Sequence, residues 1–489
     1  MLLLLTLPAH ASDFMDVWVT TAFEDDNVLA GPEASSPSPN FVERGNDTFF
    51  ENYESKYPDD YSRSNLVLYR RDEGFSDKFF TEAALALRFI PYLDPGNTKT
   101  GVLLYDDGSY VRIAYKLKGD EKQTVSLTGY AANADRFRLG YSYDLTWAGT
   151  SGFTFDPKAA PGARLQYQNQ HFYAFAGIKT AVGDFTDPIT GETRNQAYYA
   201  GLAGVGGDLG DYVKLEGGAG SFQQGQLLAQ ATVTSPLYGS LVKAVGACTQ
   251  LSVRTTPKLD YIVSNELKLY RNTPEGVPDT YIRHRRMDGV GLLLQAEGNM
   301  LAHNLLDATA EDSTVIEKAF AGDLQALVVA GTTEIGVDFV YKDLPYIVFN
   351  VPGLTSGYAL SPEQSTSPQV YGRAKVSQFF EKPRLTPSVG FGLMQPASYQ
   401  TGAGYYVQLD AANVERVPDG QAPSALLSTV AGMQWDVSRS VVGVAEVLYT
   451  IDNNKSDAIE GEDLSYTYTP APANWRNELG FNLIVRARF

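Results

Sequence analysis

The sequence predicts an all-β protein, built as a closed, antiparallel up-and-down β-barrel that crosses a membrane. Apolar and polar residues alternate along most of the chain, with the period of two that is typical of strands. No run of about 18 or more apolar residues is present, so membrane-spanning helices are not expected. The mean hydropathy of −0.20 is compatible with a barrel, because alternation hides the lipid-facing surface from an average over the chain.

The first 63 residues divide into three segments. Residues 1–11 combine an apolar stretch with the small-x-small site Ala9-His10-Ala11. They predict a signal peptide whose basic start lies upstream and which is cleaved before Ser12. Residues 12–63 begin with a candidate strand, Val17 to Phe23, and continue into Glu24 to Arg63, which carries ten acidic residues against three basic ones. This acidic, aromatic extension is expected to form either a surface loop or a plug in the lumen.

Residues 64–489 form a train of candidate strands and are expected to be one transmembrane barrel. The clearest candidate is Arg136 to Trp147, in which aromatic and leucine side chains fill one face without a gap. In this strand Leu139 and Tyr141 are expected to face lipid, while Arg138 and Ser142 face the lumen. We expect an even number of strands between about 16 and 22, with about 18 or 20 favoured.

Connections of alternating length support the same architecture. Short turns, which should face the periplasm, include Gly119-Asp120 and Asp436 to Arg439. Long loops, which should face outwards, are expected at Gly183–Thr193, Asn272–Met287, Asn350–Gln369, Pro396–Gly404 and Asp452–Asn474.

The last strand, Trp475 to Phe489, gives the most specific signal. One face carries Leu479, Phe481, Leu483, Val485, Ala487 and Phe489, and the other carries mostly polar residues including Glu478, Arg486 and Arg488. This strand resembles the C-terminal strand of bacterial outer-membrane β-barrels, which the barrel-insertion machinery reads as an address. The resemblance implies a Gram-negative outer-membrane location. It also implies that the assembly signal consists of Phe481, Leu483, Val485 and Phe489.

The resemblance implies a porin-like channel for passive diffusion of small solutes or ions. Outer-membrane lipid and lipopolysaccharide would surround it, and it would be a monomer or a homo-oligomer. The alternative is a structural or secretion component of an envelope-spanning assembly for gliding, polysaccharide export or adhesion, docked to other envelope proteins. The net charge of the protein, −18, and its pI of about 4.7 argue against nucleic-acid binding.

The sequence gives no sign of an enzyme, a cofactor or a metal site. After cleavage the histidines are His171, His284 and His303, and none lies in a catalytic motif of the known barrel enzymes. The loop from Asp452 to Asp463 has oxygen ligands at alternate positions, but Asp457 stands where a calcium loop needs glycine. The single cysteine, Cys248, is expected to be a small residue within a strand.

Two groups of charged residues are candidates for function. The first would line the pore, with cations facing carboxylates: Arg112, Lys116, Arg136, Arg138, Asp144, Glu334, Asp338, Arg486 and Arg488. This pattern resembles the charge arrangement of general porins, and the alternative is structural ion pairing, in which Glu478 would also take part. The second group is Arg283, Arg285 and Arg286, whose guanidinium groups could bind an anion or lipopolysaccharide phosphate, or simply flank a solvated loop.

Overall fold

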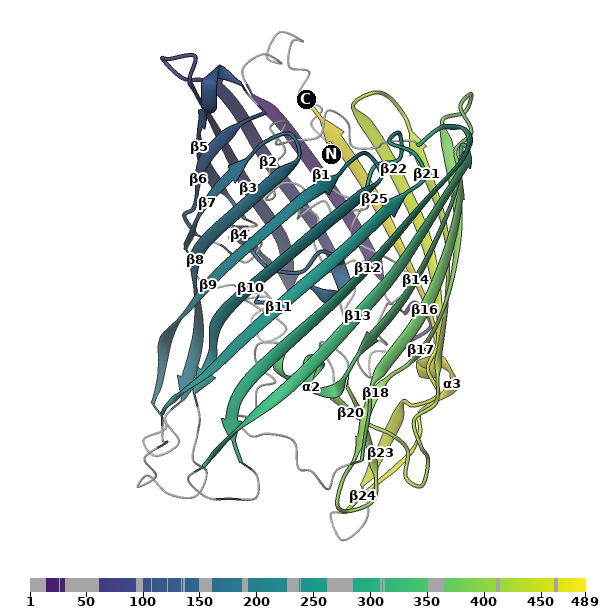
Figure 1. Ribbon diagram of the computed structural model, residues 1–489. Helices are drawn as coiled ribbons and strands as arrows, with labels where there is room; N and C mark the ends of the chain where they lie inside the picture. Colours follow the sequence, from purple (N-terminus) through teal and green to yellow (C-terminus); the bar gives the residue numbers. More distant parts are fainter. Residues whose placement is uncertain are drawn as a thin grey trace.

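The computed structural model describes the chain in segments, drawn in colour in Figure 1. These segments are residues 15–25, 27–30, 61–93, 100–106, 108–120, 122–132, 134, 137–148, 161–186, 192–226, 237, 239–261, 285–307, 310, 313–350, 365–409, 414–460 and 465–489. The expected signal peptide and most of the acidic extension lie outside these segments, as do Arg136 and Arg283.

Antiparallel strands form one closed ring (Figure 1). The first half of the ring contains β1 (Asp16–Asp25), β2 (Tyr61–Glu73), β3 (Phe79–Leu93), β4 (Thr100–Asp106), β5 (Tyr110–Lys116), β6 (Thr124–Tyr130), β7 (Gly162–Gln168), β8 (Phe172–Thr186), β9 (Thr193–Leu209) and β10 (Val213–Gln226). The second half contains β11 (Leu241–Arg254), β12 (Met287–Leu306), β13 (Thr314–Gly331), β14 (Thr333–Lys342), β16 (Gln369–Gln378), β17 (Leu385–Gln395), β21 (Leu426–Asp436), β22 (Val441–Ile451) and β25 (Asn477–Arg488).

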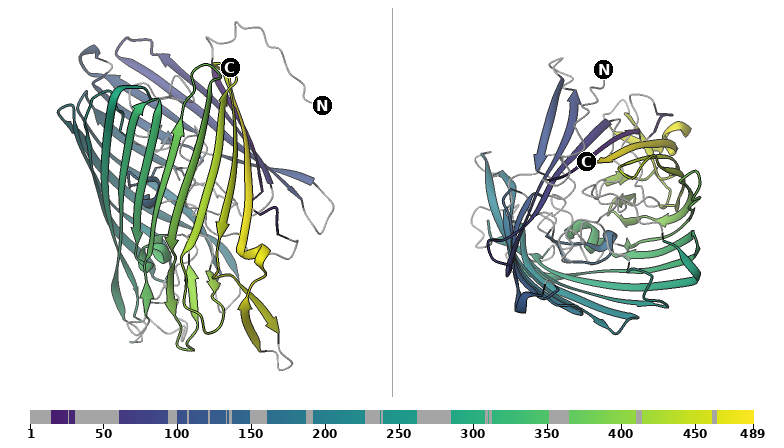
Figure 2. Two further views of the ribbon diagram at one scale, coloured as in Figure 1. Left: turned by 90° about the vertical axis from the view of Figure 1, so that its right-hand side faces the viewer. Right: turned by 90° about the horizontal axis from the view of Figure 1, so that it is seen from above.

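The sheet has 19 strands, but the barrel has 18 positions. The reason is that β4 and β5 pair in succession with the two halves of β3 and share one position. The ring closes where β1 lies between β25 and β2, with Thr20 opposite both Arg486 and Asn65. The predictions of an all-β barrel and of 18 or 20 strands are therefore confirmed. The β3–β4 hairpin leaves the ring and projects outwards (Figure 2).

The alternation in the sequence sets which side chains face inwards. In β5, Val111 and Ile113 are exposed on the outside, whereas Arg112 and Lys116 are 2 % and 6 % exposed on the inside. Because side chains alternate across a strand, a one-residue slip would turn the arginine to lipid, so the pattern fixes the register. The strand β25 behaves as expected, with Leu483 and Val485 outside and Arg486 inside.

The start of β1 and the end of β25 lie at one end of the barrel (Figure 1), which we call the turn end. Short turns join most strands there, including the turn with the 3₁₀ helix η2 (Leu117–Gly119) between β5 and β6. By the rule for such barrels, this end faces the periplasm. One predicted external loop, Asn272 to Met287, is misplaced, because the strands β11 and β12 that flank it meet at the turn end. Most of this predicted loop, residues 272–284, lies outside the described residues.

The opposite end, the loop end, carries additional structure. It contains the helices α2 (Leu344–Asn350) and α3 (Ala473–Arg476), a small sheet of β15 (Thr366–Ser367), β18 (Ala397–Gln400), β19 (Tyr406–Leu409) and β20 (Val414–Arg416), and a hairpin of β23 (Ser456–Glu460) and β24 (Tyr466–Pro470). The Arg416 guanidinium carbon lies 3.8 Å from the ring centre of Tyr405 and 4.0 Å from that of Tyr468, which joins the sheet to the hairpin. None of the helices in the described part of the chain is both long and apolar enough to span a membrane.

The clearest strand predicted from the sequence is wrong. Residues 137–148 do not join the ring, and the ladder passes directly from β6 to β7, where Tyr130 lies opposite Gly162. The segment instead folds into the barrel as an irregular loop with the 3₁₀ helix η3 (Tyr143–Leu145). Its alternating aromatic face is apolar because it packs inside the protein, and not because it meets lipid.

Phe489 ends the barrel with its ring on the outside, 68 % exposed, while its backbone bonds with that of Val17 on β1 at 2.9 and 3.1 Å. Because the ring supports no internal packing and alanine keeps both backbone hydrogen bonds, we expect Phe489→Ala to lower the yield of folded protein in the outer membrane while the purified barrel keeps its stability. Heat-modifiable mobility on gels measures the yield, and substitution of the exposed Phe380 by alanine is the control. An unchanged yield would argue against Phe489 as part of the assembly signal.

Candidate functional site

The candidate site is the segment folded into the barrel, residues 134 and 137–148, which we call the insert. Seen from above, the insert and α2 lie within the ring of strands (Figure 2). The backbone of the insert doubles back, with Leu139 and Trp147 paired in an isolated β-bridge. Gly140 at this bend has a φ of 100°, and a Cβ there would lie 2.8 Å from Thr146 Cα. Only glycine fits that position without strain.

The apolar face of the insert packs against a part of the wall where glycines stand at several inward positions. Phe137, Leu139, Leu145 and Trp147 are each at most 2 % exposed. A Cβ added to Gly177 would lie 2.6 Å from the Phe137 ring. One added at Gly218 would lie 2.8 Å from Leu139, and one at Gly246 would lie 2.8 Å from the Trp147 ring. Glycines on β8, β10 and β11 therefore make the depressions that receive the insert, and burial of its aromatic groups stabilises the docked position.

Carboxylates on the wall hold the turn of the insert. Glu297 on β12 accepts hydrogen bonds from the backbone N–H of Tyr141, at 3.0 and 3.1 Å, and from that of Ser142. The Ser142 hydroxyl donates to Asp323 on β13. The Gln325 amide donates to Asp323 at 2.6 Å and to Ser142 Oγ at 3.2 Å. Hydrogen bonds to ionised acceptors are stronger than neutral ones, so this anchor depends on charge.

Further contacts hold the two flanks of the insert. Arg373 on β16 binds Asp144 of the insert at 2.5 Å and Asp338 on β14 at 2.9 Å. The Lys179 ammonium donates to the Phe137 carbonyl at 2.6 Å, and the Asn299 amide donates to the Leu145 carbonyl at 2.6 Å. These bonds satisfy backbone groups that would otherwise be buried without partners.

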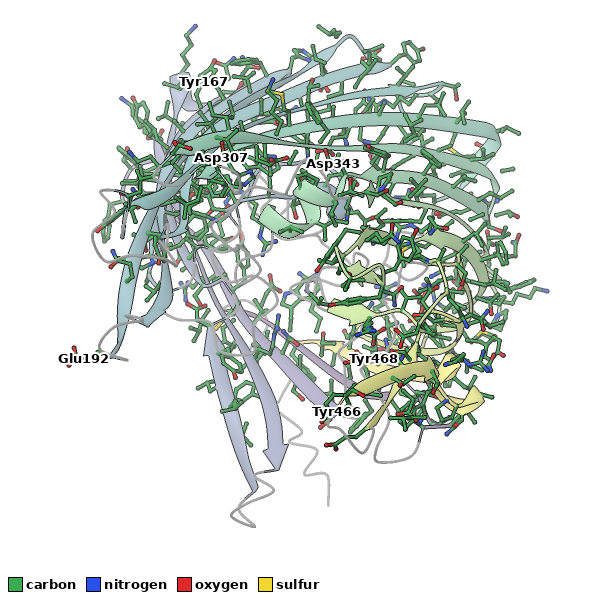
Figure 3. The ribbon with its side chains drawn as sticks, turned by 90° about the horizontal axis from the view of Figure 1, so that it is seen from below. Tyr167, Glu192, Asp307, Asp343, Tyr466 and Tyr468 are labelled. Atoms are coloured by element: carbon green, nitrogen blue, oxygen red, sulfur yellow. The ribbon has the colours of Figure 1, made fainter. Side chains whose placement is uncertain are left out.

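The helix α2 supports the insert from the loop end. The Tyr346 hydroxyl donates to the Leu145 carbonyl at 2.7 Å. Asp343, which precedes the helix (Figure 3), accepts from the backbone N–H of Tyr346 at 2.9 Å and of Phe320 at 2.8 Å. Burial raises the pKa of the Asp343 carboxyl to about 6, against the effect of these two hydrogen bonds.

Charges of opposite sign gather on different arcs of the inner wall. Among the described residues, the inward charged groups of β2 to β8 are Arg71, Glu73, Glu82, Arg88, Arg112, Lys116, Arg164 and Lys179. Those of β10 to β14 are Lys214, Glu216, Arg254, Glu297, Glu317, Asp323, Glu334, Asp338 and Lys342. Cations therefore predominate on the first arc and carboxylates on the second. The insert contacts both arcs, through Lys179 on β8 and through Glu297 and Asp323 on β12 and β13.

The cations of the first arc lie in a row set by the strand register. Arg71 is opposite Glu82, which is opposite Arg112, and Arg112 is followed through Thr128 by Arg164. The Arg112 guanidinium pairs with Glu82, and Lys116 pairs with Glu73 at 2.6 Å. Arg486 belongs to a second row, which runs through Thr20 and Asn65 to Arg88.

The predicted pore-lining residues are only partly brought together. Arg112, Lys116, Asp338 and Arg486 face the lumen from the wall, and Asp144 does so from the insert. Arg138 is half-buried in the insert, not on a strand. The remaining two lie near the turn end, where Glu334 pairs with Arg285 at 2.7 Å and Arg488 pairs with Asp16 at 3.0 Å. Arg136 lies outside the described residues.

The predicted basic run also lies at the turn end. Arg285 pairs with Glu334, and Arg286 pairs with Glu381 at 2.5 Å. The alternative drawn from the sequence is a solvated loop flank. Binding of lipopolysaccharide or another anion by Arg285 and Arg286 stays a prediction.

Sequence reasoning missed several residues of the site. Arg88, Arg164, Lys179 and Arg373 were not singled out, although each alternates with apolar neighbours in its strand. That alternation was the available signal, since it places a cation on the lumen face. Glu297 and Asp323 could not have been found, because only the fold brings the insert, more than 150 residues earlier in the chain, against them.

The loop with alternating oxygen groups has a structural role. Lys455, at its centre, forms a buried ion pair with Glu478, and Asn454 binds the backbone of Ser424. Within the described part of the chain, no group of three or more His, Cys, Asp or Glu side chains is arranged to hold a metal ion. Of the histidines, His171 is exposed in the β7–β8 turn, His303 is fully buried, and His284 lies outside the described residues.

A closed ring with an apolar outer face and a polar inner face satisfies every strand edge and hides its polar groups from lipid. The protein therefore belongs to the class of transmembrane β-barrels found in bacterial outer membranes.

The chain is similar to OccAB2 of Acinetobacter baumannii, with 8 % identity, 98 % of each chain covered and a TM-score of 0.48. It is similar to OpdK of Pseudomonas aeruginosa, solved with vanillate, with 8 % identity, coverage of 97 % and 98 %, and a TM-score of 0.46. It is also similar to OmpT of Vibrio cholerae, with 10 % identity, coverage of 97 % of this chain and 96 % of OmpT, and a TM-score of 0.35. No protein-family model and no curated protein matches the chain.

Proposed function

We propose that the protein is a passive, porin-like channel for small solutes or ions, in which the insert forms the constriction. The observation that carries this proposal is the insert itself, an internal loop anchored to one arc of the wall of a closed barrel. A barrel of about 18 strands encloses more space than its own side chains fill. An internal loop that narrows this space on one side, while charges line it, is the arrangement that a size-limited and charge-sensitive pore requires.

The segregated charges support the same proposal. Several inward charges are paired, including Arg112 with Glu82, Lys214 with Glu216, and Lys375 with Glu446. Pairing weakens the field close to each pair but leaves the excess of cations on one arc and of carboxylates on the other, so a field remains directed from the cation arc to the carboxylate arc. Such a field orders water and polar solutes in the narrow part of a channel.

Planar bilayer recording with purified protein tests the function. Steady, voltage-independent current steps are expected for an open passive channel. A barrel that inserts but carries no current, and that co-purifies with periplasmic proteins, would instead favour the scaffold alternative. The control is protein denatured and diluted into the same detergent, which should give no steps.

We expect the channel to prefer cations weakly at low salt. Residues 24–63 carry ten acidic and three basic groups, whereas ion pairs neutralise much of the lining. An excess of carboxylates near an entrance enriches cations, and this preference should fade as salt rises, because exposed charges are screened over about 10 Å at 0.1 M. Reversal potentials across a KCl gradient measure it. Anion preference would show that the arginine row of β2 to β7 controls selectivity.

A further inference from the structure

We propose that Glu297 and Asp323 are positioning residues that set the aperture of the channel by holding the insert against the wall, and that acid releases this hold. The inference rests on the proposed function for its consequence, a change in the open pore. Its structural core, a charge-dependent anchor for the insert, can be tested without any measurement of transport.

The two carboxylates form a single anchor. Glu297 and Asp323 are direct partners in the β12–β13 ladder, so their side chains leave the wall side by side on its inner face. They are 6 % and 2 % exposed. Both bind the same turn, Glu297 through the backbone N–H groups of Tyr141 and Ser142, and Asp323 through the Ser142 hydroxyl. The two carboxylates therefore hold the insert at its bend, next to Gly140.

The cation beside this anchor, Arg373, forms ion pairs with two other carboxylates. Arg373 binds Asp144 at 2.5 Å and Asp338 at 2.9 Å. The other charged, titratable or polar groups that face the anchor from surrounding elements are Gln250 and Cys248 on β11, Asn299 on β12, Gln325 on β13, Asp338 on β14, Tyr371 and Arg373 on β16, Tyr346 on α2, and Tyr141 and Asp144 of the insert. Glu297 contacts the insert through the backbone N–H groups of Tyr141 and Ser142.

The contact between Glu297 and the insert depends on ionisation of the carboxyl group, because Glu297 accepts hydrogen bonds from backbone N–H groups. An ionised carboxylate accepts the hydrogen bonds from the N–H groups of Tyr141 and Ser142 without donating a proton of its own. Protonation converts one oxygen into a donor, which faces an N–H group that is also a donor, and it removes the charge that strengthens the remaining bonds. The anchor is therefore present when Glu297 is ionised and is lost as the pH falls.

Other groups act in the same direction as Glu297. Protonation of Asp144 or Asp338 weakens the Arg373 contact on one flank of the insert. Protonation of Asp343 weakens the start of α2, which positions Tyr346 against Leu145. A low-pH response of the wild-type protein thus sums several carboxylates, and substitution of Glu297 at constant pH isolates its share.

Cys248 provides a native reporter for the position of the insert. The thiol is the only one in the chain and is 5 % exposed. A Cβ added to Gly218 would lie 2.8 Å from Leu139 and 3.3 Å from Cys248 Sγ, so the leucine of the insert lies beside the thiol. Movement of the insert away from the wall uncovers Cys248 to the lumen.

The first experiment measures labelling of Cys248 by a small water-soluble disulfide reagent, at one neutral pH, in protein folded into lipid vesicles. Glu297→Gln and Asp323→Asn should be labelled at least about tenfold faster than wild type, the factor expected from loss of one charge-assisted hydrogen bond. Glu297→Asp should stay near the wild-type rate because it keeps the charge. The matched control is Glu216→Gln, which removes an inward carboxylate that binds Tyr173 and Lys214. Its rate should equal that of wild type.

The second experiment records single-channel conductance from about pH 8 to about pH 3, a range that spans the ordinary pKa of carboxyl groups near about 4. The wild-type conductance should rise as the pH falls, and Glu297→Gln should give a raised conductance that changes less with pH. The wild-type profile remains informative even if a variant fails to fold.

The outcomes separate this inference from the proposed function. Fast labelling of Glu297→Gln in a barrel that carries no current would support the anchor and overturn the channel. Unchanged labelling of folded Glu297→Gln in a conducting barrel would overturn the anchor and leave the channel. A rise in labelling for Glu216→Gln equal to that for Glu297→Gln would also overturn it, because any lost charge would then loosen the insert.

Discussion

Replacing residues 137–147 by a short Gly-Ser linker is expected to raise single-channel conductance roughly twofold or more, because a wide barrel would lose its internal obstruction. The ring itself should remain folded, since β6 already pairs directly with β7. Conductance in planar bilayers measures the first effect, and heat-modifiable mobility measures the second.

The matched control shortens the β23–β24 hairpin by the same number of residues. That hairpin lies at the loop end and pairs only with itself among the described strands, so its loss should leave the conductance unchanged. Equal conductance for the insert deletion and wild type would mean that the insert does not limit the pore. Failure of the deletion to fold would mean that the insert serves as a core for the barrel.

Leu324→Arg is expected to lower the free energy of unfolding in lipid by about 2–4 kcal/mol, the cost of an arginine near the middle of the lipid face of a barrel. Leu324 lies on the outside of β13 and is 58 % exposed. Urea titration of protein in lipid vesicles, followed by tryptophan fluorescence, measures the change.

Gln325→Arg is the control for this substitution, because it introduces the same group one residue further along the same strand. Gln325 faces the lumen between Asp323 and Asp338, where a cation meets carboxylates instead of lipid. Its unfolding free energy should therefore change much less than that of Leu324→Arg. Equal losses for the two variants would contradict the inside and outside assigned to β13.

The pair Leu139 and Ser142 is unsuitable for this test, although the sequence favours it. Leu139 belongs to the insert and packs on Gly218 inside the barrel, and Ser142 binds Asp323. Both substitutions would disturb the lumen, and neither would meet lipid. An alternating aromatic segment can face lipid or pack on a glycine-lined patch of the inner wall, because both surroundings are apolar, and the sequence of that segment does not distinguish them.

The sequence by itself determined the class of fold and the direction of most side chains. The period of two in β5 and β25 places Arg112 and Arg486 inside and Val111 and Leu483 outside, and burial in the structure agrees. The orientation can be predicted because each charged residue on the lipid face destabilises the barrel independently of the others. The alternation within a strand therefore indicates which of its faces is inside.

The tertiary structure alone decided what fills the barrel. Gly177, Gly218 and Gly246 look like ordinary strand glycines in the sequence, and Glu297 and Asp323 look like isolated carboxylates. Closing the ring brings the glycines under Phe137, Leu139 and Trp147, and brings the carboxylates to the backbone of Tyr141 and Ser142. These contacts join segments far apart in the chain, and their energy depends on a shared cavity that exists only after closure. The alternation within a strand does not indicate contacts between the insert and the wall, so the strands could be predicted and the constriction could not.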